Sequence, residues 1–396
     1  MTLMNARAEA SAETSALQRA RALVPSLIER REKCVELRQV PIDTWGELQD
    51  ANLFRLFQPL RYGGCEADPM DFFDIQFELS AACPSTGWTW GVVAAHAWQL
   101  SLFPPQAQDD VWAQSPSALL SSSYAPVGKR VEPVGGGYRL SGAWDFCSGI
   151  DHTHWCFLGG LVPGERPEYR TFLVAKGDWI VEDHWYVSGL QGTGSKTLIL
   201  DGVFVPEHRT HRMKDAFHTR SPGHSVNPSL VYRLPFGQVF VRSISTPVLG
   251  MTSGAVDACL ALVKSKVSSV TGERAGNDPR VLEALARGRS DVEMLRLKMR
   301  ANFDEMWTHV SAGREIPLER RVQFKYESAD AVERCCRVLD DLIAAAGAKA
   351  LFRSSALSSF HMDALAARAH FGNNAPFFAR NFGGLLVGRD LSDSFL

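Results

Sequence analysis

The pattern of apolar residues changes twice along the chain, and these changes limit the possible folds more than any other feature. From about Ser15 to Trp112, apolar residues recur at the spacing of amphipathic helices. Beyond Pro116 the chain turns into short runs of β-branched and aromatic residues, separated by glycine, proline and aspartate turns. Long amphipathic stretches return at about Val239 and continue towards the C-terminus.

This order predicts an α+β multidomain protein. We expect an N-terminal helical domain over residues 1–116, a β domain over 117–215 and a C-terminal four-helix bundle over 216–396. The 396 residues, 45% of them hydrophobic, are enough to bury a sizeable core. The polar stretch "HTRSPGHSVNPS" (218–229) is either a lid or a surface loop.

Composition excludes several classes of function. The 42 basic and 44 acidic residues are not arranged in a basic run, so nucleic acid is not an expected partner. Eight cysteines without a CxxC pair predict reduced thiols rather than disulfides or zinc, and His152 with His154 is too small a set for a metal site. No signal peptide or apolar stretch of membrane-spanning length is recognisable, so we expect a soluble, cytoplasmic protein without membrane contact.

Two stretches of the predicted β domain carry a resemblance to a known family. "YRLSGAWDFCSG" (138–149) and "GLQGTGSKTLILDGVFVP" (189–206) resemble paired strand motifs of the acyl-CoA dehydrogenase superfamily. The residues that fall on these motifs are Phe146, Ser148, Gly149, Gly192, Thr193, Val203, Val205 and Pro206. The order of helices, β domain and helical bundle also matches the acyl-CoA dehydrogenase-like fold over nearly the whole chain.

The resemblance implies a flavin site in the β domain. A flavin ring is a flat apolar plate with a hydrogen-bonding edge, which requires aromatic packing and small polar groups. The residues expected to supply these contacts are Ser121, Ser122, Ser123, Tyr124, Trp144, Phe146, Cys147, Ser148, Gly192 and Thr193. Cys147 departs from relatives that carry a second serine. An alternative interpretation is that Trp144 and Phe146 are alternating core residues of a strand.

The loop "HFGNNAPFFARNFGG" (370–384) departs from the dehydrogenases. Aligning Asp363 with the family's aspartate places residues 371–373 on a signature that holds the catalytic glutamate. Phe371 then occupies the glutamate position and cannot accept a proton, so acyl-CoA oxidation becomes the runner-up function. His370 stands beside this position and is followed by the polar pair Asn373 and Asn374.

Three stretches carry a closer resemblance, to two-component flavin monooxygenases that hydroxylate phenols, including 4-hydroxyphenylacetate and secosteroid hydroxylases. They are "STGWTWGVVAAHAWQLSLF" (85–103), "SSSYAPVG" (121–128) and "ARAHFGNN" (367–374). The resemblance implies reduced FMN or FAD, supplied by a separate NAD(P)H:flavin reductase, and molecular oxygen as co-substrate. A hydroperoxide on flavin carbon 4a would hydroxylate an aromatic small molecule, and a homotetramer is expected by analogy.

Candidate roles follow from this resemblance. Ser148 is expected to donate a hydrogen bond to flavin N5. His370 is the first choice for assisting deprotonation of a phenol and His96 the second, although His96 fits equally well as a helix-buried histidine bonded to a backbone carbonyl. Ser122 is expected to assist substrate or flavin binding.

The remaining cofactor-binding candidates are charged or amide groups of the C-terminal third. Arg242 could balance the charge of reduced flavin, Arg380 and Asn381 could reach its phosphate, and Asn373 and Asn374 are placed at the cofactor. Two other functions stay open: an N- or S-oxygenase on the same fold, and a flavin-free scaffold or ligand-binding protein.

Overall fold

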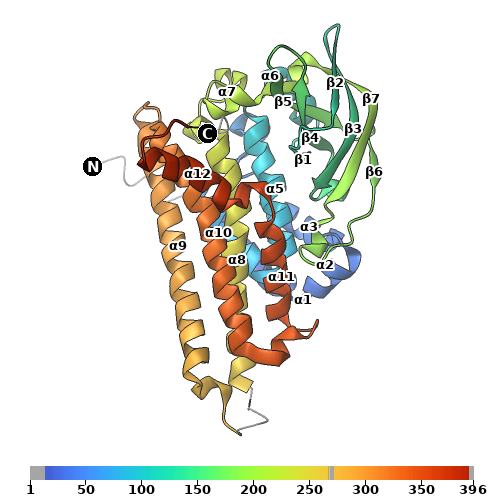
Figure 1. Cartoon of the computed structure of the whole chain (residues 1–396). Coiled ribbons are helices and arrows are strands. Elements are labelled where there is room, and N and C mark those ends of the chain that lie inside the picture. Colours follow the sequence, from blue (N-terminus) through green and yellow to red (C-terminus); the bar gives the residue numbers. More distant parts are fainter. Residues whose placement is uncertain (1–13, 266, 268–271, 392–396) are drawn as a thin grey trace, which may run out of the picture.

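The computed structural model describes residues 14–265, 267 and 272–391. Helices come first, strands follow and helices end the chain (Figure 1). The last helix before the strands ends at Trp112 and the first strand starts at Leu120, while the last strand ends at Arg212. The domain boundaries at residues 116 and 215 stay predictions. Most of the first 20 residues, where no signal peptide was recognised, lie outside the described residues.

Helices of 7 to 17 residues build the N-terminal part: α1 (Ala16–Glu29), α2 (Arg31–Leu37), α3 (Ile42–Asp50), α4 (Pro69–Ala82), α5 (Pro84–Leu100) and α6 (Pro105–Trp112). Ser15 and Gln18 form a capping box at the start of α1, and Asp68 caps α4. Nearly every residue of α5 is buried, which explains why its sequence is apolar on all sides.

The eight strands form two four-stranded sheets. The strands are β1 (Leu120–Ser123), β2 (Arg130–Val134), β3 (Gly137–Cys147), β4 (Trp155–Val162), β5 (Glu168–Ala175), β6 (Ile180–Glu182), β7 (Lys196–Pro206) and β8 (Thr210–Arg212). One sheet has the order β1-β4-β5-β8 and the other β2-β3-β7-β6, and an apolar core that includes Leu140, Leu158 and Phe172 links them. β1 is the terminal strand of the first sheet, where it pairs with β4 in parallel. The serines of β1 therefore lie at an edge of that sheet.

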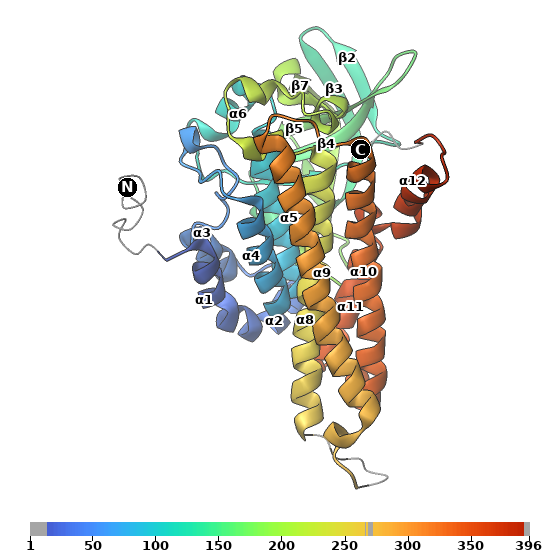
Figure 2. The same cartoon turned by 90° about the vertical axis from the view of Figure 1, so that its left-hand side faces the viewer.

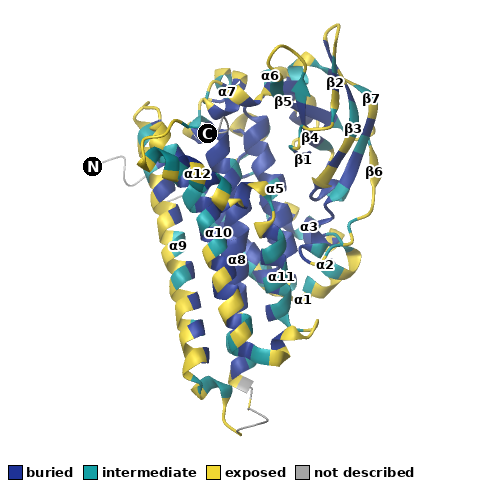
Figure 3. Ribbon diagram, viewed as in Figure 1, coloured by how far each residue is buried: buried dark blue, intermediate teal, exposed yellow. Residues whose placement is uncertain are grey.

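Long helices build the C-terminal part: α7 (Met213–Phe217), α8 (Phe236–Ser265), α9 (Pro279–Ser311), α10 (Leu318–Ala346), α11 (Ala356–Arg368) and α12 (Ala375–Leu386). Helices α8 to α11 run alongside one another in both views (Figures 1 and 2). α8 packs against α4 and α5 as well as against α9, α10 and α11, so it joins the two helical parts. Figure 3 shows α8 largely buried, while α9 keeps an exposed outer face.

The segment Phe236–Lys264 of α8 is long and apolar enough to cross a membrane by length and composition. However, 67% of its most apolar window is buried inside the protein. Burial among five neighbouring helices accounts for this composition, as expected for the central helix of a folded domain.

Candidate active site

Ser148 follows strand β3 at a point where the strand loses its regular register. The pairing of β3 with β7 shifts between Trp144 and Cys147, and Phe146 has a left-handed backbone with φ of 65°. Phe146 is turned outwards and is 68% exposed, whereas Ser148 is buried. The backbone N–H of Gly149 then donates to the Thr193 carbonyl at 2.9 Å, which fixes Ser148 beside the second motif.

The Ser148 hydroxyl belongs to a chain of hydrogen bonds. Thr193 Oγ1 donates to the Leu190 carbonyl at 2.9 Å, so Ser195 must donate to Thr193 across their 2.7 Å contact. Ser148 must in turn donate to Ser195 across 2.8 Å. Trp88 Nε1 of helix α5 donates to Ser148 Oγ at 3.4 Å. The proton of Ser148 is therefore directed into the protein, and its oxygen is left as an acceptor.

His96 is buried in helix α5 with a defined tautomer. Its Nδ1 lies 2.7 Å from the Leu120 carbonyl, which can only accept, so Nδ1 carries the proton and Nε2 carries the lone pair. Burial lowers the pKa of His96 to about 4, so the ring is neutral near pH 7. The ring lines a small cavity of about 20 Å³ together with Gln99, Tyr124 and Phe240.

His370 has the opposite tautomer. It precedes the short 3-10 helix η9 (Phe371–Asn373), and its Nδ1 accepts the backbone N–H of Gly372 at 3.0 Å. In the neutral ring the proton must therefore sit on Nε2. Burial lowers the pKa of His370 to about 4, which keeps the ring neutral. His370 thus offers an N–H donor, where His96 offers a lone pair.

Trp88 and Phe240 connect these groups into one wall. The His370 ring lies 5.9 Å from Trp88 and 6.0 Å from Phe240, measured between ring centroids. Phe240 also lies 5.3 Å from Tyr124, whose ring is 6.3 Å from His96. The structure therefore brings together residues from α5, α8, the end of β3 and η9. We call Ser148, Trp88, His370, Phe240, Tyr124 and His96 the catalytic wall.

The serines of β1 support this wall. Ser121 Oγ donates to the Ser148 carbonyl at 2.8 Å, so it positions the backbone of the loop. Tyr124 donates its hydroxyl to Gln99 Oε1, and Ser122 lies beside the same hydroxyl. Burial raises the pKa of Tyr124, so the phenol stays protonated. The Gln99 Nε2 amide is buried and has no partner within the described ranges.

Trp144, Cys147 and Phe146 do not belong to the wall. Trp144 is fully buried between the sheets and donates from Nε1 to the Gly159 carbonyl at 2.9 Å. Cys147 is also fully buried and donates to the Trp144 carbonyl. Phe146 contacts Trp185 edge-on at 6.0 Å on the outer surface. The alternative interpretation of Trp144 as a core residue therefore agrees with the structure, and the expected flavin packing by Trp144 does not.

Arg242 is not brought to the wall either. It lies on α8 two positions after Phe240, which turns it to the opposite side of the helix. Its Nη2 donates to the Met299 carbonyl of α9 at 2.8 Å, and its guanidinium lies over the Phe303 ring. The expectation that Arg242 balances the flavin's charge has no support in this placement.

The polar residues of the C-terminal loop divide into buried and exposed groups. Asn373 is buried, with Nδ2 donating to the Ile244 and Ala367 carbonyls. Asn374 accepts from the backbone N–H of Phe377 and caps α12. Arg380 is exposed and lies over the Phe377 ring, while Asn381 is buried. Asn373 adjoins the catalytic wall, because its backbone N–H donates to the His370 carbonyl at 2.9 Å.

Gly192 serves close packing. It lies in the 3-10 helix η3 (Gln191–Thr193), and a Cβ at this position would meet Cys34 Sγ at 2.4 Å. Its backbone N–H donates to Ser85 Oγ at 3.1 Å. The glycine thus allows α2 and α5 to hold the loop that carries Thr193 and Ser195.

Two family models match the chain. The acyl-CoA dehydrogenase N-terminal domain matches residues 11–115, and the acyl-CoA dehydrogenase C-terminal domain matches residues 242–375. The fold therefore contains both of these domains, with a β region between them.

Full-length relatives decide the family. The chain is 37% identical over 361 residues to the flavin-dependent monooxygenase oxygenase subunit HsaA of Rhodococcus jostii, covering 90% of this chain and 94% of the relative. The chain belongs to the flavin-dependent monooxygenases. It is also 30% identical to the oxygenase component of p-hydroxyphenylacetate 3-hydroxylase of Acinetobacter baumannii, over 95% of this chain and 90% of that protein. The crystal structure of 3-HSA hydroxylase from Rhodococcus sp. RHA1 superposes with a TM-score of 0.92 at 35% identity, covering 97% and 100% of the two chains.

The predicted class of this monooxygenase is confirmed. It is the oxygenase component of a two-component system that hydroxylates an aromatic compound with reduced FMN or FAD and molecular oxygen. Membership among oxygenase components implies a separate reductase that supplies the flavin. The predicted acyl-CoA dehydrogenase-like fold is confirmed as N- and C-terminal domains of this type with a β region between them.

The catalytic wall of the monooxygenase fits a flavin. Phe240, Tyr124 and His370 are only partly buried, so their rings remain open to a flat partner. Ser148 supplies a hydroxyl oxygen at the rim. The Asn373 Oδ1 atom is buried without a partner among the described residues, so it offers a free acceptor. This set matches the apolar faces and the hydrogen-bonding edge of the cofactor.

Sequence reasoning missed four residues of this site: Trp88, Gln99, Ser195 and Phe240. Gln99 stands three positions after His96, on the same face of a helix, and this spacing was visible in the sequence. Ser195 could not be found in this way, because Thr193 ends the 3-10 helix η3 and Gly194 has a left-handed backbone with φ of 56°. Phe240 gave no such signal, because α8 is apolar on most sides.

Proposed function

We propose that this monooxygenase hydroxylates a phenol and that His96 holds the phenol's hydroxyl group. The observation that carries this proposal is the tautomer of His96, whose Nε2 lone pair is left over after Nδ1 donates to Leu120. The unpartnered Gln99 amide lines the same cavity. A phenol hydroxyl can donate to His96 and accept from Gln99, so it satisfies both groups at once.

The size of the cavity supports an oxygen atom rather than a whole ring in this position. A water-sized group needs about 10–15 Å³, and the cavity measures about 20 Å³. The phenol oxygen enters it, while the ring lies against Phe240 and the other aromatic side chains that line it. Relatives named for p-hydroxyphenylacetate and resorcinol support a phenol as the substrate class.

His96 acts by polarising the phenol. The pKa of His96 is lowered to about 4, while a phenol has a pKa of about 10. The two pKa values differ by about 6, so full transfer of the proton from the phenol to His96 would cost roughly 8 kcal/mol. A hydrogen bond from the phenol to Nε2 avoids this cost and still shifts electron density towards the ring.

His370 is assigned a different role from the one expected from sequence. Its single lone pair accepts the Gly372 N–H, so it cannot take a proton from the phenol without giving up this contact. We assign His370 as the N–H donor to the oxygen species at the wall. This proposal differs from the expectation that His370 assists deprotonation of the phenol.

Ser148 is likewise assigned as an acceptor. Reduced flavin, when bound, would supply the chemistry that activates molecular oxygen. Because the Ser148 proton points to Ser195, its oxygen is free to accept the N5–H of the reduced cofactor. Holding that proton in place disfavours loss of hydrogen peroxide, and the aromatic side chains around Ser148 exclude water.

The finer points of assembly rest on analogy. We assign the C-terminal helices as a four-helix bundle at the centre of a homotetramer, in a soluble cytoplasmic protein. Acyl-CoA oxidation is not favoured, because Phe371 fills the glutamate position and lies 53% exposed against Phe377 and Phe378.

The test supplies the purified protein with reduced flavin from a separate reductase, under air, and follows consumption of a panel of phenols. We expect a hydroxylated product, tighter binding of reduced than of oxidised flavin, and no NADH oxidation without the reductase. Rapid NADH oxidation by the protein alone, or oxidation of indoles and thioethers in preference to every phenol, would refute the proposal.

A further inference from the structure

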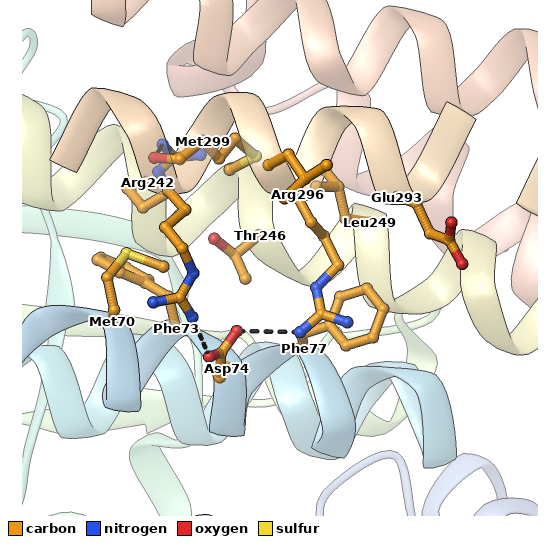
Figure 4. A pocket seen from close by; sticks show the side chains of 12 residues that line it. Met70, Phe73, Asp74, Phe77, Arg242, Thr246, Leu249, Glu293, Arg296 and Met299 are labelled. Carbon is orange, nitrogen blue, oxygen red and sulfur yellow. Dashed lines mark hydrogen bonds and ion pairs between the residues drawn. The ribbon is translucent and has the colours of Figure 1, made fainter. Parts of the chain in front are cut away.

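A second pocket lies on the side of α8 that faces away from the catalytic wall. It has a volume of about 320 Å³ and is formed by α4, α8 and α9. Its lining residues are Met70, Phe73, Asp74, Phe77, Arg242, Thr246, Leu249, Glu293, Arg296, Leu297, Met299 and Arg300 (Figure 4). Arg242, Thr246 and Leu249 share one face of α8, roughly opposite to Phe240. The helix itself therefore separates this pocket from the reaction site.

Arg242 carries a buried charge that the protein does not fully satisfy. It is only 2% exposed, and its Nη2 donates to the Met299 carbonyl at 2.8 Å. Its Nε and Nη1 have no hydrogen-bond partner in the part of the chain that the structure describes. Burial lowers the pKa of Arg242 to about 9, so the guanidinium is still charged at neutral pH. A buried cation with two unused donors is costly unless an anion reaches it.

Thr246 adds a second unused polar group. It lies one helical turn after Arg242 and is also buried, and its hydroxyl has no partner within the described ranges. In Figure 4 the Thr246 side chain lies between Arg242 and Arg296. Arg242 and Thr246 thus place an N–H pair and a hydroxyl on the same wall of the pocket.

Among the described residues, the carboxylates that line the pocket form no ion pair with Arg242. Glu327, which is not part of the lining, favours the charged guanidinium from a distance but pairs with Lys298 at 3.1 Å. Asp74 binds Arg296 at 3.0 Å and Arg300 at 2.6 Å, so its two oxygens are already used. Glu293 lies at the opposite end of the pocket from Arg242 (Figure 4). Three arginines and two carboxylates line the pocket, which leaves an excess of one positive charge.

We propose that this pocket binds a small organic anion with one carboxylate group and an apolar body. The carboxylate accepts from Arg242 and Thr246, and a planar two-oxygen group matches the geometry of a guanidinium. The apolar body lies against Phe73, Phe77 and Leu249. An inorganic anion would leave this apolar surface unused, and the volume falls in the range of small-molecule sites, which begins at about 300 Å³.

The test uses phenylacetate as the probe and phenylacetamide as its uncharged isostere. Titration calorimetry on the purified full chain should detect phenylacetate, while phenylacetamide should bind roughly tenfold or more weakly. Arg242→Met and Thr246→Val should each weaken phenylacetate binding, by roughly tenfold or more for Arg242→Met. Because Thr246 has an unsatisfied buried hydroxyl, Thr246→Val should keep or raise the melting temperature of the unliganded protein.

Two control variants separate this pocket from other sites. Arg289 lies on α9 outside the pocket and pairs with Asp257 at 2.5 Å, so Arg289→Met should leave phenylacetate binding unchanged. His96→Asn should also leave it unchanged, because His96 lies on the other side of α8. The proposal would be overturned by equal binding of phenylacetate and phenylacetamide, or by no binding at millimolar phenylacetate. Undiminished phenylacetate binding to both folded single variants, Thr246→Val and Arg242→Met, would also overturn it.

Discussion

Replacing His96 by asparagine isolates the one atom on which the proposed chemistry depends. An asparagine Nδ2 reaches the position of the histidine Nδ1, so it can still donate to the Leu120 carbonyl, which accepts from the histidine at 2.7 Å. It cannot reach the position of Nε2. The variant should therefore fold and bind reduced flavin normally, but should lose the acceptor for the phenol hydroxyl.

The magnitude follows from the pKa of His96. General bases contribute about 10²–10⁴-fold to a rate. Because burial lowers the pKa of His96 to about 4, the ring polarises the phenol rather than removing its proton completely. The loss should therefore lie at or below the lower limit of this range, at about 10–100-fold, which corresponds to a hydrogen bond worth roughly 1.5–3 kcal/mol.

The assay measures oxygen uptake, hydrogen peroxide and hydroxylated product, with a reductase supplying reduced flavin. His96 is neutral from about pH 5 upwards, so its own titration does not contribute. The defect should shrink as the pH approaches the pKa of the phenol, about 10, where phenolate forms without help. His96→Gln, whose amide oxygen reaches the Nε2 position, should retain more activity. If His96→Asn couples oxygen to product as well as the wild type at neutral pH, the reasoning is wrong.

Three further perturbations test the other assignments. His370→Asn keeps an acceptor for the Gly372 N–H but removes the Nε2–H donor. Product formation should therefore fall about tenfold or more, with extra hydrogen peroxide. Normal coupling of oxygen uptake to product would contradict the donor role. Ser195→Ala removes the acceptor of the Ser148 proton and should weaken the preference for reduced over oxidised flavin by roughly fivefold. Ser195→Thr should preserve this preference. Titration of the protein with flavin in both redox states measures it. Burial raises the pKa of Asp363 to about 7, from about 4 when unfolded, so stability present at low pH is lost as the pH rises through this interval. Asp363→Asn should melt higher than the wild type above pH 7 and similarly near pH 4, and a pH-independent difference in melting temperature would contradict this sign.

The order of helices, strands and helices could be predicted from the sequence because it depends on short-range periodicity. Helical and strand periods differ, and some helix starts carry local capping residues, such as Ser15 and Asp68. The order of the elements depends on neighbours in sequence, so a single chain reveals it. The expected placement of Ser148 and Thr193 at the cofactor came from the resemblance of two motifs to a known family.

The positions of Trp144 and Phe146 could not be predicted in the same way. The family resemblance placed both residues at the flavin, and the alternative interpretation placed both in the core, because residues two apart in a regular strand share a face. The register shift after Trp144 and the left-handed backbone of Phe146 break this alternation. Trp144 and Cys147 then point into the core, while Phe146 points outwards. A bulge of this kind depends on the pairing with β7 and leaves little trace in the sequence of β3 alone.

The roles of the two histidines were also out of reach, because they are set by backbone atoms of other elements. The tautomer of His96 depends on the Leu120 carbonyl of β1, and that of His370 depends on the turn that brings the Gly372 N–H back to the ring. The same backbone turn sends Phe371 outwards against α12, while the His370 ring packs between Trp88 and Phe240. Phe371 thus offers no proton acceptor to the wall. The adjacent His370 ring offers an Nε2–H donor, because its Nδ1 accepts the Gly372 N–H. Since one neutral histidine at the wall is a donor and the other an acceptor, an oxygen species and a phenol can be held at the same time without either histidine changing its charge.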